Sequence, residues 1–138
     1  MQIGKAIGAH FAAVLVSSLA LLVGIETLAH GAIGIVQGVG KWIGGILIFL
    51  VISLASLPIG LSIRAMIGQF RVVPIFGALI GGACVGLALL FVLHPAMYPG
   101  VSFQTHPVGL TVVHLGAGVI GGWIWHRFEF GAGDKSVA

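Results

Sequence analysis

Charged residues are scarce in this sequence, and that scarcity excludes a water-soluble domain. Only 7% of the 138 residues are charged and 59% are hydrophobic, and the mean hydropathy is +1.20. A soluble domain needs a polar shell, which so few charged side chains do not provide. We therefore expect a chain whose surroundings are the lipid bilayer.

Cysteine and acidic residues are also nearly absent. The one cysteine, Cys84, can form neither an intramolecular disulfide nor a cysteine-rich metal site. Of the three acids only Glu26 lies in or next to an apolar run, so a chain of buried acids for proton or cation transport is lacking. The P-loop and nucleophile-elbow motifs are missing too, and we expect no catalysis by this chain alone.

Four long apolar runs are what the sequence does contain. They cover residues 6–25, 42–63, 72–93 and 108–125. Each is close to the roughly 20 residues with which a helix crosses the hydrocarbon of a bilayer. No small-x-small cleavage site follows the first run, so we expect it to stay as a span. The runs predict an all-α integral membrane protein with four transmembrane helices and short loops, in one domain of residues 1–130 with a polar tail at 131–138.

Basic residues predict the orientation of these spans. With an even number of spans, both termini lie on the same side as the turn between the second and third runs. Five of the six Lys and Arg residues fall on that side: Lys5, Arg64, Arg71, Arg127 and Lys135. Lys41 stands alone on the other side, next to Trp42 as an interfacial anchor. Because cytoplasmic loops carry the excess of basic residues, we expect both termini in the cytoplasm and the protein in the cytoplasmic (inner) membrane of a bacterium. Scattered singly, these residues form no patch for nucleic acid.

Glycine fills 23 positions, and in the third and fourth runs it recurs at the spacing of helix contacts. Small residues four apart let two helix backbones approach closely within a membrane. We expect seven residues to pack helices together: Gly77, Gly81, Gly82, Gly86, His114, Gly118 and Gly122. The sequence leaves open whether the neighbouring helix belongs to this chain or to another subunit.

Six histidines among so few polar residues are the main candidates for chemistry. Glu26 and His30 are four residues apart and share one face if the first helix continues that far. His94 and His106 flank the outer loop between the last two runs. With the first pair they form a candidate site for copper, zinc or another transition metal. The spacing matches no established metal-binding motif, and ordinary roles in polar loops are the competing interpretation.

Haem is the second cofactor that the histidines suggest. Ligation by two histidines needs both at equal depth on neighbouring helices, and His10 and His126 meet that condition. The alternative is that both lie near lipid headgroups. His114, deeper in the fourth run, has no partner at its own depth, and we expect it to hydrogen-bond a neighbouring helix.

The leading hypothesis from the sequence is a non-catalytic transmembrane subunit of a larger membrane complex. Four helices with ample small-residue surface and very short loops favour it. Its expected partners are the lipid bilayer and other membrane subunits, or further copies of itself. The alternative is a small homo-oligomeric channel or carrier, with a polar pathway along Ser17, Ser53, Ser56, Thr111 and His114. A subunit that binds haem or a metal is the third hypothesis.

Overall fold

A computed structural model describes residues 3–69, 73–92, 94 and 104–131, and these residues form helices and short turns without a strand. Their helices are α1 (Ile3–His30), α2 (Ile33–Gly44), α3 (Ile46–Gln69), α4 (Pro74–Val92) and α6 (Pro107–Phe130). All except α2 are long and apolar enough to cross a bilayer. The predicted all-α class is confirmed for these residues, with four helices that could span a membrane.

Local sequence explains where most of these helices begin and end. Pro74 and Pro107 are the first residues of α4 and α6. At that position the backbone N–H has no acceptor within the helix, so proline costs no hydrogen bond. Gly31 ends α1 with a φ of 63°, a left-handed conformation that favours glycine. Pro58 lies inside α3 and does not end it. The helical run is interrupted at Gly45, between α2 and α3. The second predicted span, 42–63, thus straddles the end of one helix and the start of the next.

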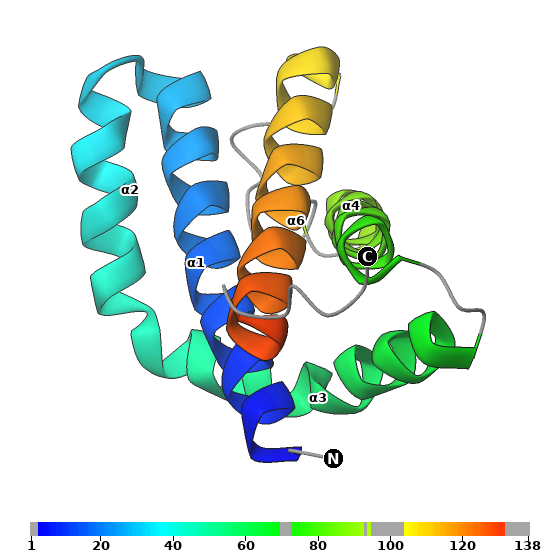
Figure 1. The fold of residues 1–138 in the computed structure, drawn as a ribbon. Coiled ribbons are helices and arrows are strands. Elements are labelled where there is room, and N and C mark those ends of the chain that lie inside the picture. Colours follow the sequence, from blue (N-terminus) through cyan, green and yellow to red (C-terminus); the bar gives the residue numbers. More distant parts are fainter. Residues whose placement is uncertain (1–2, 70–72, 93, 95–103, 132–138) are drawn as a thin grey trace.

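Helix α2 is the element that the sequence did not predict. It lies antiparallel against α1 (Figure 1), so close that a Cβ added to Gly38 would lie 2.6 Å from the Cα of Val23. Further along, the Trp42 indole N–H donates to the Leu15 carbonyl at 3.1 Å and to the Ser18 hydroxyl oxygen at 3.0 Å. Trp42, in the last turn of α2, therefore packs beside the middle of α1 and not near either end of α1, where an interfacial anchor was expected.

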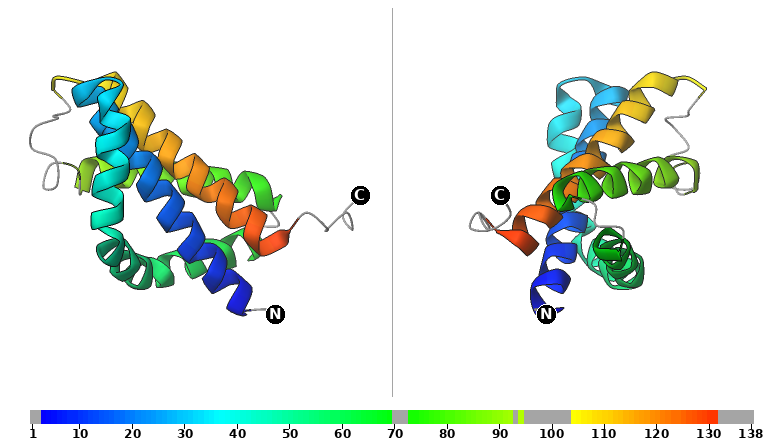
Figure 2. Two further views of the ribbon diagram at one scale, coloured as in Figure 1. Left: turned by 90° about the vertical axis from the view of Figure 1, so that its left-hand side faces the viewer. Right: turned by 45° about the vertical axis from the view of Figure 1, so that its right-hand side comes forward.

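Helices α1 and α6 form an antiparallel pair, and α4 crosses α6 on another side (Figures 1 and 2). A Cβ added to Gly24 of α1 would lie 2.6 Å from Cγ1 of Val113 on α6. Ile25, Leu90 and Leu110 form a buried cluster that joins α1, α4 and α6. These three helices are therefore packed together through both glycine contacts and aliphatic side chains.

Helix α3 runs across the ends of α1 and α6 instead of alongside them (Figure 1). Of its 24 residues only Ser53 is buried. A Cβ added to Gly77 of α4 would lie 2.7 Å from Cγ1 of Ile67 on α3, and one added to Gly81 would lie 3.1 Å from Cγ2 of Ile63. The end of α3 therefore meets the beginning of α4. Further from these ends, a cleft lies between the two helices.

Candidate functional site

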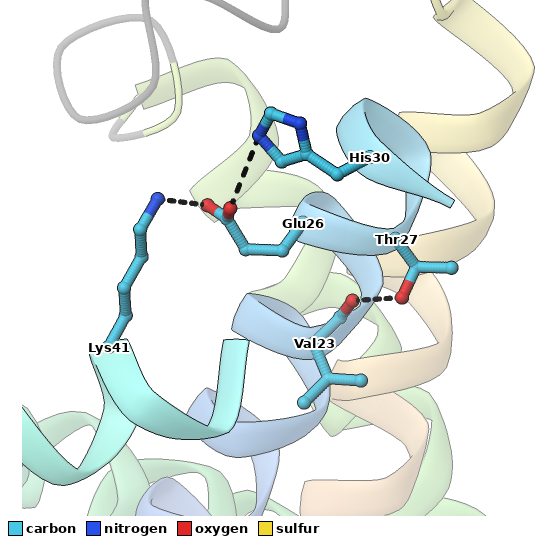
Figure 3. Close-up of polar contacts among 5 residues, drawn as sticks. All are labelled: Val23, Glu26, Thr27, His30 and Lys41. Carbon is cyan, nitrogen blue, oxygen red and sulfur yellow. Dashed lines mark hydrogen bonds and ion pairs between the residues drawn. The ribbon is translucent and has the colours of Figure 1, made fainter. Parts of the chain in front are cut away.

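Both acids in the described part of the chain are buried and paired with a base. Glu26 on α1 accepts a hydrogen bond from the Lys41 ammonium of α2 at 2.6 Å (Figure 3). The Nε2 atom of His30 lies 3.7 Å from the other carboxylate oxygen. The Glu26 side chain is 6% exposed, whereas those of Lys41 and His30 are 58% and 52% exposed. Glu26 is therefore the member of the contact whose buried charge needs a basic partner.

The second ion pair stands at the opposite end of the α1–α6 pair. The Arg64 guanidinium of α3 donates to the carboxylate of Glu129 on α6, whose side chain is 4% exposed. Gly24 of α1 lies against Val113 of α6, and the two helices are antiparallel. Glu129 follows Val113 by 16 residues, so it is level with the residue 16 positions before Gly24, about residue 8 of α1. From there to Glu26 is about 18 residues, or about 27 Å of helix. That separation is close to the roughly 30 Å thickness of a bilayer's hydrocarbon core.

The layer between the two ion pairs is apolar, and α2 enters it from the Glu26 end. The Lys41 side chain reaches back toward that end to meet Glu26, as long basic side chains do near a membrane surface. Trp42, beside Leu15 and Ser18, lies about 10 residues or about 14 Å below Glu26. Helix α2 thus ends near the middle of the apolar layer, and α3 continues from there.

A cleft of about 290 Å³ lies inside this layer, between the α1–α6 pair and the helices α3 and α4. Its walls are mainly aliphatic side chains and glycines. Six polar residues line it: His10, Ser17, Ser18, Ser56, His94 and His114. Along α1 the cleft extends from His10 to Leu22, about 18 Å of helix. No Lys, Arg, Asp or Glu of the described residues lines it, so histidine supplies its only titratable groups.

His10 forms the polar contact at the Glu129 end of the cleft, where it joins α1 to α3. Its Nε2 atom lies 3.0 Å from the Ser53 carbonyl oxygen and 3.0 Å from the Ser56 hydroxyl oxygen. A carbonyl oxygen only accepts, so in the neutral ring the proton is on Nε2 and Nδ1 holds a lone pair. The ring lies against Gly60, where a Cβ would collide with Nδ1. The backbone of α3 is therefore fitted around this histidine.

His94 and His114 meet at the Glu26 end of the cleft. Their ring centroids are 5.0 Å apart and the rings are nearly perpendicular, at 80°. His114 is 2% exposed, and its Nδ1 atom lies 2.9 Å from the Leu110 carbonyl oxygen of its own helix. Both predictions for His114 are wrong: its hydrogen bond is to its own helix and not to a neighbouring one, and His94 lies beside it at the same depth. The sequence analysis placed His94 at the outer surface, whereas the structure turns this residue inward.

Five of the seven predicted packing residues meet where α4 crosses α6: Gly82, Gly86, His114, Gly118 and Gly122. A Cβ added to Gly82 would collide with the carbonyl of Gly118, and one added to Gly118 would collide with the carbonyl of Gly82. The two backbones are therefore in direct contact. The other two, Gly77 and Gly81, lie on a second face of α4 and contact α3.

The predicted metal ligands are divided among separate places. Glu26 and His30 adjoin each other at the α1–α2 hairpin. His94 lies in the cleft, whereas His106 is exposed, with Nδ1 2.9 Å from the Thr105 hydroxyl oxygen. Within residues 3–69, 73–92, 94 and 104–131, no three His, Cys, Asp or Glu side chains gather so that they could hold one metal ion.

The predicted haem ligands, His10 and His126, make contacts in different directions. His10 is hydrogen-bonded to α3 through Ser53 and Ser56. His126 packs against Phe130, one turn further along its own helix, with ring centroids 5.3 Å apart. Ligation of one haem by both rings would require His10 to give up its bonds to α3.

Sequence reasoning missed Lys41 as the partner of Glu26 and Ser56 as the partner of His10. The spacing of Gly34 and Gly38 was the available signal for a helix packed against α1, because glycines four apart mark close helix contacts. Comparisons with protein-family models, with curated proteins and with solved structures find no match. Function therefore has to be inferred from the residues and their contacts.

Proposed function

We propose that this chain is a non-catalytic transmembrane subunit of a larger membrane complex, which binds its partners through glycines that its own helices leave uncovered. Six glycine pairs in the described residues are spaced four apart: 4 and 8, 34 and 38, 40 and 44, 77 and 81, 82 and 86, and 118 and 122. Four of these pairs contact another helix of the chain. Around Gly4, Gly8, Gly40 and Gly44, an added Cβ would meet no described atom within 4 Å.

The observation that carries this proposal is the contrast within α2. Gly34 and Gly38 approach the α1 backbone so closely that a Cβ on either would collide with it. Gly40 and Gly44 have the same spacing but lie about 120° around the helix from the first pair, on an exposed face. Spacing that packs a helix so closely inside the chain is equally suited to pack a helix of another polypeptide.

The competing hypothesis, a homo-oligomeric channel or carrier, has weaker support. Ser17, Ser56 and His114 line the cleft. The hydroxyls of Ser53 and Thr111, however, donate to carbonyls of their own helices at 2.8 and 2.7 Å. Two of the five residues expected along a polar pathway, Ser53 and Thr111, are not among those that line the cleft. Solute flux through liposomes that contain the purified chain, lost in His114→Leu, would favour the carrier over the subunit.

Native mass measurement after gentle detergent extraction from the native host tests the subunit proposal. We expect the tagged chain in a stoichiometric complex with at least one other polypeptide, and we expect Gly40→Leu with Gly44→Leu to abolish it. Gly116→Leu is the matched control, because Gly116 also has no described atom within 4 Å of an added Cβ but belongs to no such pair. A homogeneous monomer or homodimer of the unaltered chain would contradict the proposal.

We also propose that the Glu129 end of the molecule faces the cytoplasm, with both termini. The excess of basic residues on that side supports this orientation. Cysteine labelling in a Cys84→Ala background tests it, with Ala32→Cys at the exposed α1–α2 turn and Gly68→Cys at the exposed end of α3. A membrane-impermeant maleimide added outside intact cells should label the first and not the second. Labelling of Gly68→Cys alone would reverse the orientation.

A further inference from the structure

The polar side chains that line the cleft between the α1–α6 pair and α3 and α4 are three serines, three histidines and the indole of Trp125. The serine hydroxyls are already used, because Ser17 donates to the Val14 carbonyl at 3.2 Å and Ser18 to the Leu15 carbonyl at 2.9 Å. Ser56 likewise donates to the Ser53 carbonyl at 3.3 Å. The serine donors are therefore used, and the remaining polar groups of the cleft are the histidine rings and the Trp125 indole.

His114 is the clearest of these groups. Its Nδ1 atom faces the Leu110 carbonyl at 2.9 Å, and a carbonyl oxygen only accepts, so the neutral ring carries its proton on Nδ1. The lone pair is then on Nε2, which has no hydrogen-bond partner among the residues that the structure describes. The residue is 2% exposed and lines the cleft, so this nitrogen is an acceptor with unused capacity.

The position of the cleft defines what can satisfy that acceptor. The cleft lies between the Glu26 and Glu129 ion pairs, in the layer that matches the hydrocarbon core, so its ligand comes from the membrane. No Lys or Arg of the described residues lines it, and an anionic headgroup would find no counter-charge. A carbonyl or ether oxygen would place one lone pair against another. Only a group that donates a hydrogen bond complements the lone pair of His114.

We propose that this cleft binds a membrane-dissolved amphiphile whose head is a hydroxyl group, as in a phenol, a hydroquinone or a long-chain alcohol. The hydroxyl donates to Nε2 of His114, and the apolar tail lies along the cleft toward His10. The volume of about 290 Å³ is at the lower end of the range for small-molecule sites, which fits one ring with a single chain. This site is separate from the uncovered glycine pairs and does not depend on the subunit proposal.

Binding of tritiated 4-nonylphenol to the purified chain in phosphatidylcholine nanodiscs tests the proposal, with empty nanodiscs subtracted. We expect one saturable site per chain. The matched competitor is 4-nonylanisole, which has the same tail and ring but no donor, and it should compete at least about tenfold less well, the loss expected for one unmade hydrogen bond. Absence of a saturable component, or equal competition by the two compounds, would overturn the proposal.

Two variants locate the site. His114→Phe keeps an aromatic ring but removes the acceptor, and it should lower the affinity for 4-nonylphenol about tenfold and abolish the preference over 4-nonylanisole. His126→Phe, outside the cleft, should change neither. Because His114→Phe also removes the bond to the Leu110 carbonyl, Val85→Trp provides a second variant. Val85 lines the cleft from α4, so a larger side chain there should fill the cleft while the His114 acceptor is kept. Unchanged binding in Val85→Trp would contradict the assigned site.

Discussion

The crossing of α4 and α6 gives a direct test of how these helices are held together. Gly82→Ala adds a methyl group where the three nearest atoms belong to the backbones of Gly118 and Gly122. No side chain can rotate out of the way, so the two helices have to separate. On the same helix α6, a Cβ added to Gly116 would meet no described atom within 4 Å. Gly116→Ala is therefore the matched control.

We expect Gly82→Ala to lower the free energy of unfolding by about 2 kcal/mol. Forcing a methyl group into closed packing costs about 1–3 kcal/mol. Separation also weakens the van der Waals contact between the two backbones. Against these losses, alanine favours a helix over glycine by up to about 1 kcal/mol. Gly116→Ala receives only that gain, and its stability should be unchanged or higher.

Unfolding by SDS in dodecylmaltoside micelles, followed by far-ultraviolet circular dichroism, measures both free energies. The reciprocal variant Gly118→Ala should cost about as much as Gly82→Ala. The double variant should cost less than the two together, because both methyl groups push apart the same two backbones. Equal stability of Gly82→Ala and Gly116→Ala would refute the direct backbone contact, and full additivity would show that the two glycines do not face each other.

The buried polar contacts give three further predictions for the same titration. Lys41→Met leaves the Glu26 carboxylate buried without its ammonium partner and should lower the free energy of unfolding by about 3 kcal/mol. Glu26→Gln leaves only an exposed lysine without its partner and should lower it by about 1 kcal/mol. Equal costs would contradict the asymmetric burial of the pair. Arg64→Met should resemble Lys41→Met, because the Glu129 side chain is only 4% exposed, and a neutral effect would show that this pair contributes little. Trp42→Phe removes an indole N–H bonded to α1 and should cost about 1 kcal/mol, with a stability equal to the unaltered chain as the contrary result.

Lipid restricts the backbone to few solutions, and this is why the sequence predicts the long helices well. Hydrocarbon offers no partner to an unpaired N–H or C=O group, so a run of about 20 apolar residues has to be helical. Helix α2 escaped the prediction because its 12 residues are too few to cross a bilayer. Its position depends on Gly34 and Gly38 meeting the α1 backbone, a contact between segments that hydropathy alone does not report.

Side-chain partners across helices were the least predictable part of the site. His94 meets His114 because its side chain is buried beside α6, and no local sequence pattern fixes that position. Lys41 reaches Glu26 only because α2 folds back along α1. Predicted pairs within one helix depend on spacing alone, and Glu26 with His30, four residues apart, was placed together by both sequence and structure.

The uncovered glycines of α2 and the cleft lie on different surfaces, which gives a last prediction. Ser18 links the two regions, since it lines the cleft and its hydroxyl oxygen accepts the Trp42 N–H of α2 at 3.0 Å. Because that bond belongs to the α1 side of α2, Gly40→Leu with Gly44→Leu should not disturb it. This double variant should lose its partner polypeptide and keep 4-nonylphenol binding, whereas Val85→Trp should do the reverse. If either variant lost both properties, the partner and the amphiphile would have to act on one shared surface, and the separation of the two sites would be wrong.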